Sequence, residues 1–146
     1  MNPLSNLNID DLGRSHKDQQ IYEQFKKQIL KEFFTIEDYI KINYLQYESI
    51  LHMNLKKAIK NNKSLEYNLI KNPYPYNIKS NMQSNMQSNI QHYVLFSEKE
   101  IPKTEQLKII KNNLDIENKN FIYFTNAYDK RSIKNLWHLH ILIQEM

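Results

Sequence analysis

Hydrophobic residues in the first part of the chain recur at helical spacing. Between residues 15 and 33 they form one stripe at intervals of four: Ile21, Phe25, Ile29 and Phe33. This spacing predicts an amphipathic helix, for which Ser15 is a suitable N-cap. The stretch "TIED" at residues 35–38 resembles a capping box with Asp in place of Glu, and it predicts a second helix through "YIKINYL".

Two more helices are expected before Pro73. The segment "YESILHMNLKKAIKNN", residues 47–62, carries an imperfect apolar stripe: Ile50, Met53, Leu55 and Ile59. This stripe predicts a third helix. The segment "LEYNLIK", residues 65–71, predicts a short fourth helix that Ser64 caps and Pro73 ends. The N-terminal half is therefore expected to be helical.

The period of the pattern changes in the second half. The segments "HYVLFS" (92–97) and "FIYFT" (121–125) are aromatic and β-branched, which favours strands. The segment "WHLHILIQ" (137–144) alternates His with apolar residues and predicts a third strand. Between the first two strands, "EQLKIIKNNL" predicts a helix capped by Thr104, with Leu107, Ile110 and Leu114 facing the core. "NAYDKRS" (126–132) has the composition of a turn into the last strand.

This order of elements predicts an α+β fold, in which a helical N-terminal half packs on a small, mainly antiparallel sheet formed by the C-terminal half. We expect the sheet to be covered on one face. Residues 1–14 are polar and without period, and are expected to form a flexible arm before a single domain at 15–146. Within that domain, "SNMQSNMQSNIQ" (80–91) is a low-complexity repeat that we expect in a surface loop, where added length costs little.

Composition narrows the class of protein. With 40% hydrophobic and 25% charged residues among 146, the chain falls in the range of globular proteins. It contains no Cys, which excludes disulfides and thiolate metal sites. The N-terminal segment lacks the layout of a signal peptide, and no apolar run approaches the length of a membrane span. We therefore expect a cytoplasmic protein without a membrane partner.

The net charge of +4 and the isoelectric point near 9.1 raise the question of nucleic-acid binding. Of the 20 basic residues, only Arg14 and Arg131 are Arg, the residue best suited to phosphate recognition. The Lys residues are scattered among Asn, Ile and Tyr, a skew typical of an AT-rich genome. We interpret the charge as a solvated surface and expect a small-molecule ligand rather than a nucleic acid. The chain has no P-loop, dinucleotide-binding glycine motif or other motif that names a cofactor.

His138 and His140 are the residues most suggestive of chemistry. Alternation in a strand places both on one face, about 6.6 Å apart along the chain, and leaves Leu139 and Ile141 on the other face as core. One interpretation is a pair hydrogen-bonded within the sheet, because buried imidazoles need partners. A second is metal binding, with His92 on another strand as a third ligand. A third is a nucleophile or general base acting on a phosphoryl or nucleotidyl substrate.

Residues near these histidines offer matching groups. Arg131 and Ser132 precede the last strand, and Asn126 begins the same turn. Together they provide donors suited to a phosphate or carboxylate, although a surface cation and a turn cap are equally good interpretations of the first two. In "NPYPYN" (72–77), we interpret Tyr74 as part of a rigid corner, and leave open whether Tyr76 belongs to the corner or to a site.

Several segments carry a resemblance to a known family: "NPYPYNI", "IQHYVLFSEKEI" and "FIYFTNAYDKRSIKNLWHLHILI". They resemble an uncharacterised family of fungi and some large DNA viruses, named after the fungal N-acetylglucosamine-induced protein. The matching positions are Asn72, Pro75, Tyr76, His92, Ser97, Phe124, Asn126, Ser132, Ile133, His138 and His140. The resemblance covers about residues 30–146 and implies a shared fold and a cluster of special residues. Phe96 and Trp137 depart from the pattern, where the family usually has Trp and often Glu.

The last strand is also similar, more distantly, to the signature strand of the histidine-triad nucleotide hydrolases and transferases. That similarity implies His138 as the nucleophile and His140 as the last His, while Leu136 stands in place of the first. The sequence thus predicts a domain that binds a small phosphorylated, sugar or nucleotide ligand through its His-x-His strand. The alternatives are a histidine-dependent phosphohydrolase or nucleotidyl transferase, and a site in which His residues alone bind a metal. His138 and His140 are the candidate catalytic residues, and the candidate ligand-binding residues are Arg131, Ser132, Asn126, His92 and Tyr76.

Overall fold

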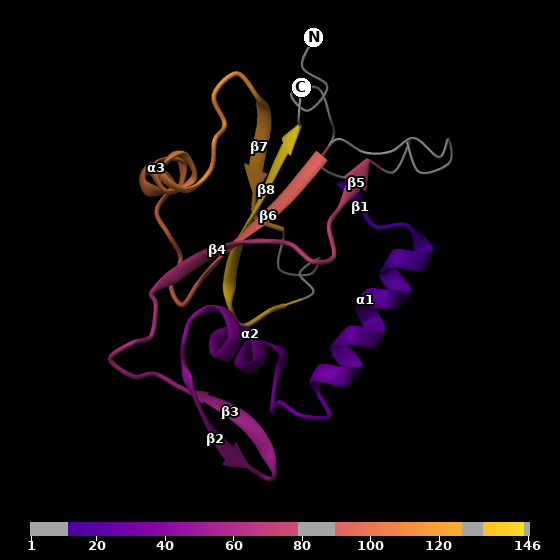
Figure 1. Ribbon diagram of the computed structural model, residues 1–146, viewed down its shortest axis with the longest axis vertical. Helices are drawn as coiled ribbons and strands as arrows, with labels where there is room; N and C mark the ends of the chain where they lie inside the picture. The colour runs from indigo at the N-terminus through magenta and orange to yellow at the C-terminus, as the bar shows by residue number, and fades with distance from the viewer. Residues whose placement is uncertain (1–11, 79–89, 127–132, 145–146) are drawn as a thin grey trace.

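Helices and strands alternate along the chain in a different order from the one expected. The computed structural model describes residues 12–78, 90–126 and 133–144. In chain order the elements are β1 (Leu12–Gly13), α1 (His16–Ile29), α2 (Ile36–Tyr44), β2 (Glu48–His52), β3 (Leu55–Ile59), β4 (Tyr67–Lys71), β5 (Asn77–Ile78), β6 (Ile90–Ser97), α3 (Lys103–Asn113), β7 (Asn120–Phe124) and β8 (Trp137–Gln144). Figure 1 shows two helices leading into a central sheet, which confirms the predicted α+β class.

The centre of the fold is a four-stranded antiparallel sheet in the order β4-β6-β8-β7. The two middle strands, β6 and β8, pair along their whole length, and His138 lies opposite Phe96 while His140 lies opposite Val94. Alternation gives this sheet two unlike faces. We name them the aliphatic face, which carries Leu95, Leu139, Ile141 and Ile143, and the polar face, which carries His92, His138 and His140.

Both faces of the sheet are covered, whereas one covered face was expected. Helix α3 packs on the aliphatic face through Ile109 and Ile110. Helix α2 packs on the other side, where Ile40 joins a cluster with Val94 and Phe96. In Figure 1, α3 lies on one side of the sheet, and α1 and α2 lie on the other. The polar face is therefore an interior surface of the protein.

The first two predicted helices are confirmed, together with their caps. The Ser15 hydroxyl accepts a hydrogen bond from the Asp18 amide at 3.1 Å, as an N-cap should. The Thr35 hydroxyl accepts from the Asp38 amide at 3.0 Å, as an N-cap should, and donates to the Asp38 carboxylate at 2.6 Å. Helix α1 ends at Ile29, short of the expected boundary.

The third predicted helix is wrong: residues 48–59 form the hairpin β2–β3. Its two-residue turn, Met53–Asn54, has positive φ at both positions (52° and 66°), as a type I′ turn requires. The other edge of β3 is held by the chain before α2, because the Lys56 amide donates to the Glu32 carbonyl at 2.9 Å and the Phe34 amide to the Lys56 carbonyl at 2.8 Å. These pairings join residues far apart in sequence, so a local apolar stripe could not reveal them.

The fourth predicted helix is also wrong, because "LEYNLIK" contributes the edge strand β4. This strand pairs with β6, and Leu69 lies opposite Leu95. The three predicted strands of the C-terminal half are confirmed as β6, β7 and β8, and the helix between them is confirmed as α3. That helix begins after Pro102 without a side-chain cap, so the expected cap at Thr104 is not formed.

The N-terminal segment enters the fold earlier than expected. Leu12 and Gly13, which we placed in a flexible arm, form β1 and pair with β5. Leu12 is buried in a small cluster with Phe124 and Leu142. The preceding residues, 1–11, and residues 79–89, which include most of the repeat, lie outside the described residues, while Ile90 and Gln91 belong to β6. Among the described residues, no helix has the length and apolar character needed to cross a membrane.

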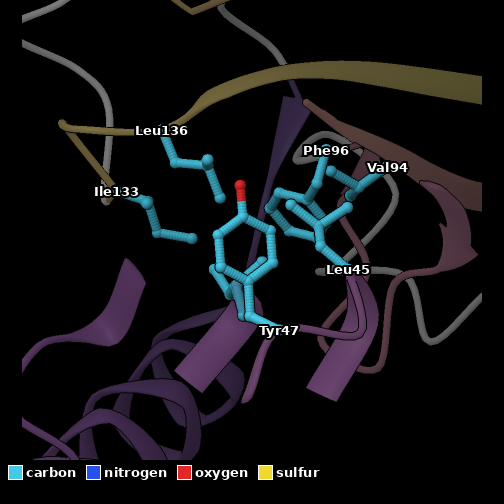
Figure 2. Close-up of a cluster of buried hydrophobic side chains, with 7 residues drawn as sticks. Leu45, Tyr47, Val94, Phe96, Ile133 and Leu136 are labelled. Carbon is cyan, nitrogen blue, oxygen red and sulfur yellow. The ribbon is translucent and has the colours of Figure 1, made fainter. Parts of the chain in front are cut away.

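Tyr47 is a buried tyrosine that packs with Val94 and Phe96 in the cluster next to the histidines. Figure 2 shows the Tyr47 ring among apolar side chains, with its hydroxyl directed toward Ile133 and Leu136. That hydroxyl makes no hydrogen bond with the described residues. Burial, and secondly the Glu98 carboxylate, which lies outside hydrogen-bond geometry, raise the pKa of Tyr47. The side chain therefore acts as a hydrophobic ring that carries one unsatisfied polar atom.

Candidate functional site

Two of the predicted site residues are in direct contact on the polar face. His92 on β6 and His140 on β8 are diagonal neighbours in the strand register. Their side chains are only 1% and 5% exposed. His92 Nε2 lies 2.8 Å from His140 Nδ1, which is hydrogen-bond distance. The two imidazoles thus satisfy one another inside the protein.

The hydrogen bonds define which ring nitrogens carry protons. The backbone amide of Tyr76 donates to His92 Nδ1 at 2.9 Å, so this nitrogen must hold a lone pair. The proton of neutral His92 is then on Nε2, from which it is donated to His140 Nδ1. His140 in turn carries its proton on Nε2. The histidine pair is therefore a directed chain of donors that begins at the backbone.

Asn126 and Tyr76 close this chain at its far end. The Asn126 Nδ2 atom lies 3.2 Å from His140 Nε2 and 3.2 Å from the Tyr76 hydroxyl. Because His140 Nε2 carries a proton, it needs an acceptor, and the amide supplies one when its oxygen and nitrogen exchange places by a half-turn. The Tyr76 ring also packs against the rings of His92 and His140, with centroids 4.6 and 5.1 Å away. Tyr76 therefore belongs to the corner and also contacts the histidine pair.

Both members of the pair remain uncharged at neutral pH. Burial lowers the pKa of His92 from 6.5 to about 3, and the positive charges of Arg14 and then His138 act in the same direction. Burial likewise holds the pKa of His140 well below its usual value, and electrostatic interactions with His92, His138 and Arg14 act in the same direction. A neutral pair needs no counter-ion, and within the described residues the hydrogen bonds of the pair involve no carboxylate.

His138 lies on the same face but has a different environment. Its Nδ1 is 3.0 Å from the Leu136 carbonyl, to which it donates, so the lone pair of the neutral ring is on Nε2. Its ring meets that of His140 edge to face, with centroids 5.2 Å apart. His138 and His140 both line a pocket, whereas His92 is not part of the lining. His92 therefore supports the pocket from behind.

The pocket lies between α1, α2 and the polar face. The cavity that it encloses has a volume of about 60 Å³, well below that of sites that enclose a whole small ligand, so it can take in only part of one. Six aromatic rings line it: Tyr22, Phe25, Tyr39, Tyr44, Tyr74 and Phe96. The charged side chains in the lining are Arg14 and Lys26. A largely aromatic wall with two cations and two histidines suits a ligand that has both a flat apolar surface and a negative charge.

Arg14 is the site residue that the sequence reading missed. We assigned it to the arm, yet it follows β1 and lines the pocket. Its Nε donates to the Tyr74 carbonyl at 2.8 Å. This bond fixes the guanidinium beside residues 72–77, which we call the Pro-Tyr corner. The signal that could have found it is weak: Arg14 is one of only two Arg residues in a Lys-rich chain.

Two of the predicted ligand-binding residues, Arg131 and Ser132, lie outside the described residues. Three of the others, His92, Asn126 and Tyr76, join His140 in one hydrogen-bonded network. A metal site is not supported. Within the described ranges no three His, Asp or Glu side chains are placed to hold an ion, and the facing nitrogens of His92 and His140 are engaged with each other.

The fold and the site together define a small α+β domain with an aromatic pocket backed by a buried histidine pair. The chain belongs to the family described as protein of unknown function DUF3605, whose model matches residues 2–144. This membership confirms the expectation of an uncharacterised domain family.

The other comparisons concern the fold. No curated protein matches the chain. A solved chain, described as the crystal structure of HTC1, superposes with a TM-score of 0.56 at 17% identity, covering 91% of this chain and 76% of its own. At this level of identity the likeness extends to the fold alone.

Proposed function

We propose that this protein is a binding domain for a small phosphorylated sugar or nucleotide, which it holds in the pocket in front of His138 and His140. One observation carries the proposal: a pocket lined by aromatic rings combines two cations and two histidines. Aromatic rings can stack on a base or on the apolar face of a sugar, and guanidinium and ammonium groups bind phosphate.

The role of the histidine pair in this proposal is to hold the pocket wall. Both ring nitrogens of His140 have partners, His92 on one side and Asn126 on the other. A ring held in this way presents its flat surface rather than a lone pair. The pair therefore supports the shape of the site, and His138 is the histidine best placed to contact the ligand.

The resemblance to the family named after the N-acetylglucosamine-induced protein guides the choice of probes. N-acetylglucosamine 6-phosphate and UDP-N-acetylglucosamine test the sugar class, and AMP tests the nucleotide class. The absence of Cys fits a reducing compartment, so cytoplasmic small molecules are the appropriate panel.

The test is calorimetric titration of the untagged protein with these three probes. We expect saturable binding of at least one probe and at least a tenfold weaker affinity in His138→Ala. The matched control is His52→Ala, which removes a histidine from the exposed strand β2, away from the pocket. Circular dichroism confirms folding of both variants. Absence of binding by all three probes, or equal weakening by the two variants, contradicts the proposal.

The second candidate function is a histidine-dependent phosphohydrolase or nucleotidyl transferase. The hydrogen bond from His138 Nδ1 to the Leu136 carbonyl favours it, because it directs the nucleophilic lone pair to Nε2. In such a reaction Nε2 attacks phosphorus, the P–O bond to the leaving group breaks, and the leaving oxygen takes a proton from solvent. Water then attacks the phosphorus of the histidine intermediate, the P–N bond breaks, and phosphate or nucleoside monophosphate is released with the imidazole regenerated.

This candidate is distinguished from simple binding by product formation. We expect release of the leaving group from UDP-N-acetylglucosamine or a nucleotide, with complete loss in His138→Ala and retention in His52→Ala. Binding without detectable turnover over many hours supports the binding domain and contradicts the enzyme.

A further inference from the structure

The guanidinium of Arg14 is held rigidly at the pocket by groups that carry no negative charge. Strand β1 brings Arg14 beside the Pro-Tyr corner by pairing with β5. There its Cζ atom lies 4.1 Å from the centroid of the Tyr22 ring and 4.8 Å from that of Tyr76. Its Nε bonds the Tyr74 carbonyl. Stacking and this hydrogen bond fix the plane of the group, as bidentate recognition of an anion requires.

No carboxylate neutralises Arg14 among the described residues. None of the ion pairs in the described ranges includes it. Its contacts there are a carbonyl, two aromatic rings and the amide oxygen of Gln19, the last at 3.5 Å. These hydrogen bonds use two of its five N–H donors. A half-buried cation in a mostly apolar pocket is costly to leave without a counter-charge.

A second cation lies against the same ring. Lys26 Nζ is 4.9 Å from the centroid of Tyr22 and also lines the pocket. Its ion pair with Glu23, at 3.2 Å, involves an acidic side chain that is about half exposed, and such pairs are weak. Tyr22 thus has a guanidinium and an ammonium in contact with one ring. Two positive charges match a phosphate monoester, which carries up to two negative charges, better than a carboxylate, which carries one.

We propose that Arg14, with Lys26 beside it, is the phosphate anchor of the pocket, and that the ligand of this protein is a phosphate monoester whose ring lies against the aromatic wall. This proposal rests on the proposed binding function and deepens it by naming the charged group that is recognised. In this proposal the two-residue strand β1 positions Arg14, which directly follows it.

The test compares two ligand pairs that differ only in phosphate: AMP against adenosine, and N-acetylglucosamine 6-phosphate against N-acetylglucosamine. We expect Arg14→Gln to weaken binding of the phosphorylated member about 10- to 100-fold and to leave the weak binding of its partner unchanged. Arg14→Lys, which keeps the charge but loses the planar fork, should give an intermediate loss. Lys26→Gln should weaken the phosphorylated ligand less, because an ammonium is a single point charge.

The matched control is Lys57→Gln, which removes a cation from the exposed position on β3, outside the pocket lining. It should bind as the wild type does. Thermal unfolding and binding of the unphosphorylated probe verify that each variant is folded. If adenosine or N-acetylglucosamine binds as tightly as its phosphate, or if Arg14→Gln weakens both members of a pair equally, the anchor is wrong while the binding function stands. If no member of either pair binds, both proposals fail.

Discussion

The two faces of the central sheet are built from the same two strands, but one is stabilised by close packing and the other also needs hydrogen bonds. On the aliphatic face, β6 and β8 present Leu and Ile side chains to α3, and each buried atom there needs only close packing. On the polar face, the alternate residues include His92, His138 and His140, which are almost as deeply buried. Each buried ring nitrogen of the pair is matched by a partner on another element.

The two faces differ in what their buried side chains need in order to be stable. Burying an imidazole without partners is costly, whereas burying an isoleucine is favourable. The polar face is therefore stable only because the Pro-Tyr corner and Asn126 supply hydrogen bonds from outside the sheet. A face that depends on so many partners is better explained by a requirement of the pocket than by a requirement of the core.

The largest effect is expected on the aliphatic face. Ile141 is completely buried and packs in the cluster beneath α3. Ile141→Ala should lower the free energy of unfolding by about 2–5 kcal/mol, because it removes buried methyl groups and leaves a cavity. Urea denaturation measures the change, and Ile141→Val should cost about 0.5–1.5 kcal/mol. Equal stability of the alanine variant and the wild type would falsify the assignment of this face as core.

Mild acid should destabilise the protein through the two buried histidines of the polar face. The folded-state pKa of His92 is about 3, and that of His140 is also depressed, whereas both are near 6.5 when unfolded. The unfolded chain therefore binds more protons below pH 6.5. The free energy of unfolding therefore has its full value above pH 6.5. It decreases as the pH falls toward 3, by about 1.4 kcal/mol per pH unit for each histidine that stays neutral in the folded state.

Urea denaturation at pH 7.5, 6.5 and 5.5 measures this slope, in a range above most carboxylate titrations. His16→Gln changes an exposed histidine at the start of α1 and should keep the wild-type dependence. A free energy of unfolding that stays constant from pH 7.5 to 5.5 would show that the pair is not buried in its neutral form.

The smallest effect is expected at the buried hydroxyl of Tyr47. Tyr47→Phe removes an oxygen that has no hydrogen bond with the described residues, so the free energy of unfolding should stay level or rise by up to about 1 kcal/mol. The same substitution at Tyr76 removes a hydroxyl that is bonded to Asn126 and should cost about 0.5–1.5 kcal/mol. Thermal or urea denaturation of the two variants gives the comparison. A larger loss in Tyr47→Phe than in Tyr76→Phe would reverse our interpretation of both hydroxyls.

The features predicted from sequence are those encoded in short segments. The helix caps at Ser15 and Thr35 depend on bonds within three residues, and the period of "WHLHILIQ" alone separates His138 and His140 from Leu139 and Ile141. The hairpin β2–β3 and the strand β4 were missed because their apolar spacing is compatible with a helix, and pairing with distant segments decides between the two structures.

The same limit applies to the site. His138, His140, His92, Asn126 and Tyr76 were found as candidates, but the bond between His92 and His140 follows from the register of β6 against β8, which a single segment does not contain. Arg14 was missed because a strand of two residues has no detectable period, and only its pairing with β5 reveals it.

The position of Arg14 affects how the boundaries of an expressed fragment of this protein should be chosen. The first helix begins after Ser15, so a truncation designed to start at the first regular helix retains α1, α2 and all strands of the central sheet. It nevertheless deletes the guanidinium of the pocket and the buried Leu12. An expression screen that ranks such fragments by yield alone would select a domain that lacks Arg14. A negative binding result would then describe the fragment rather than the protein.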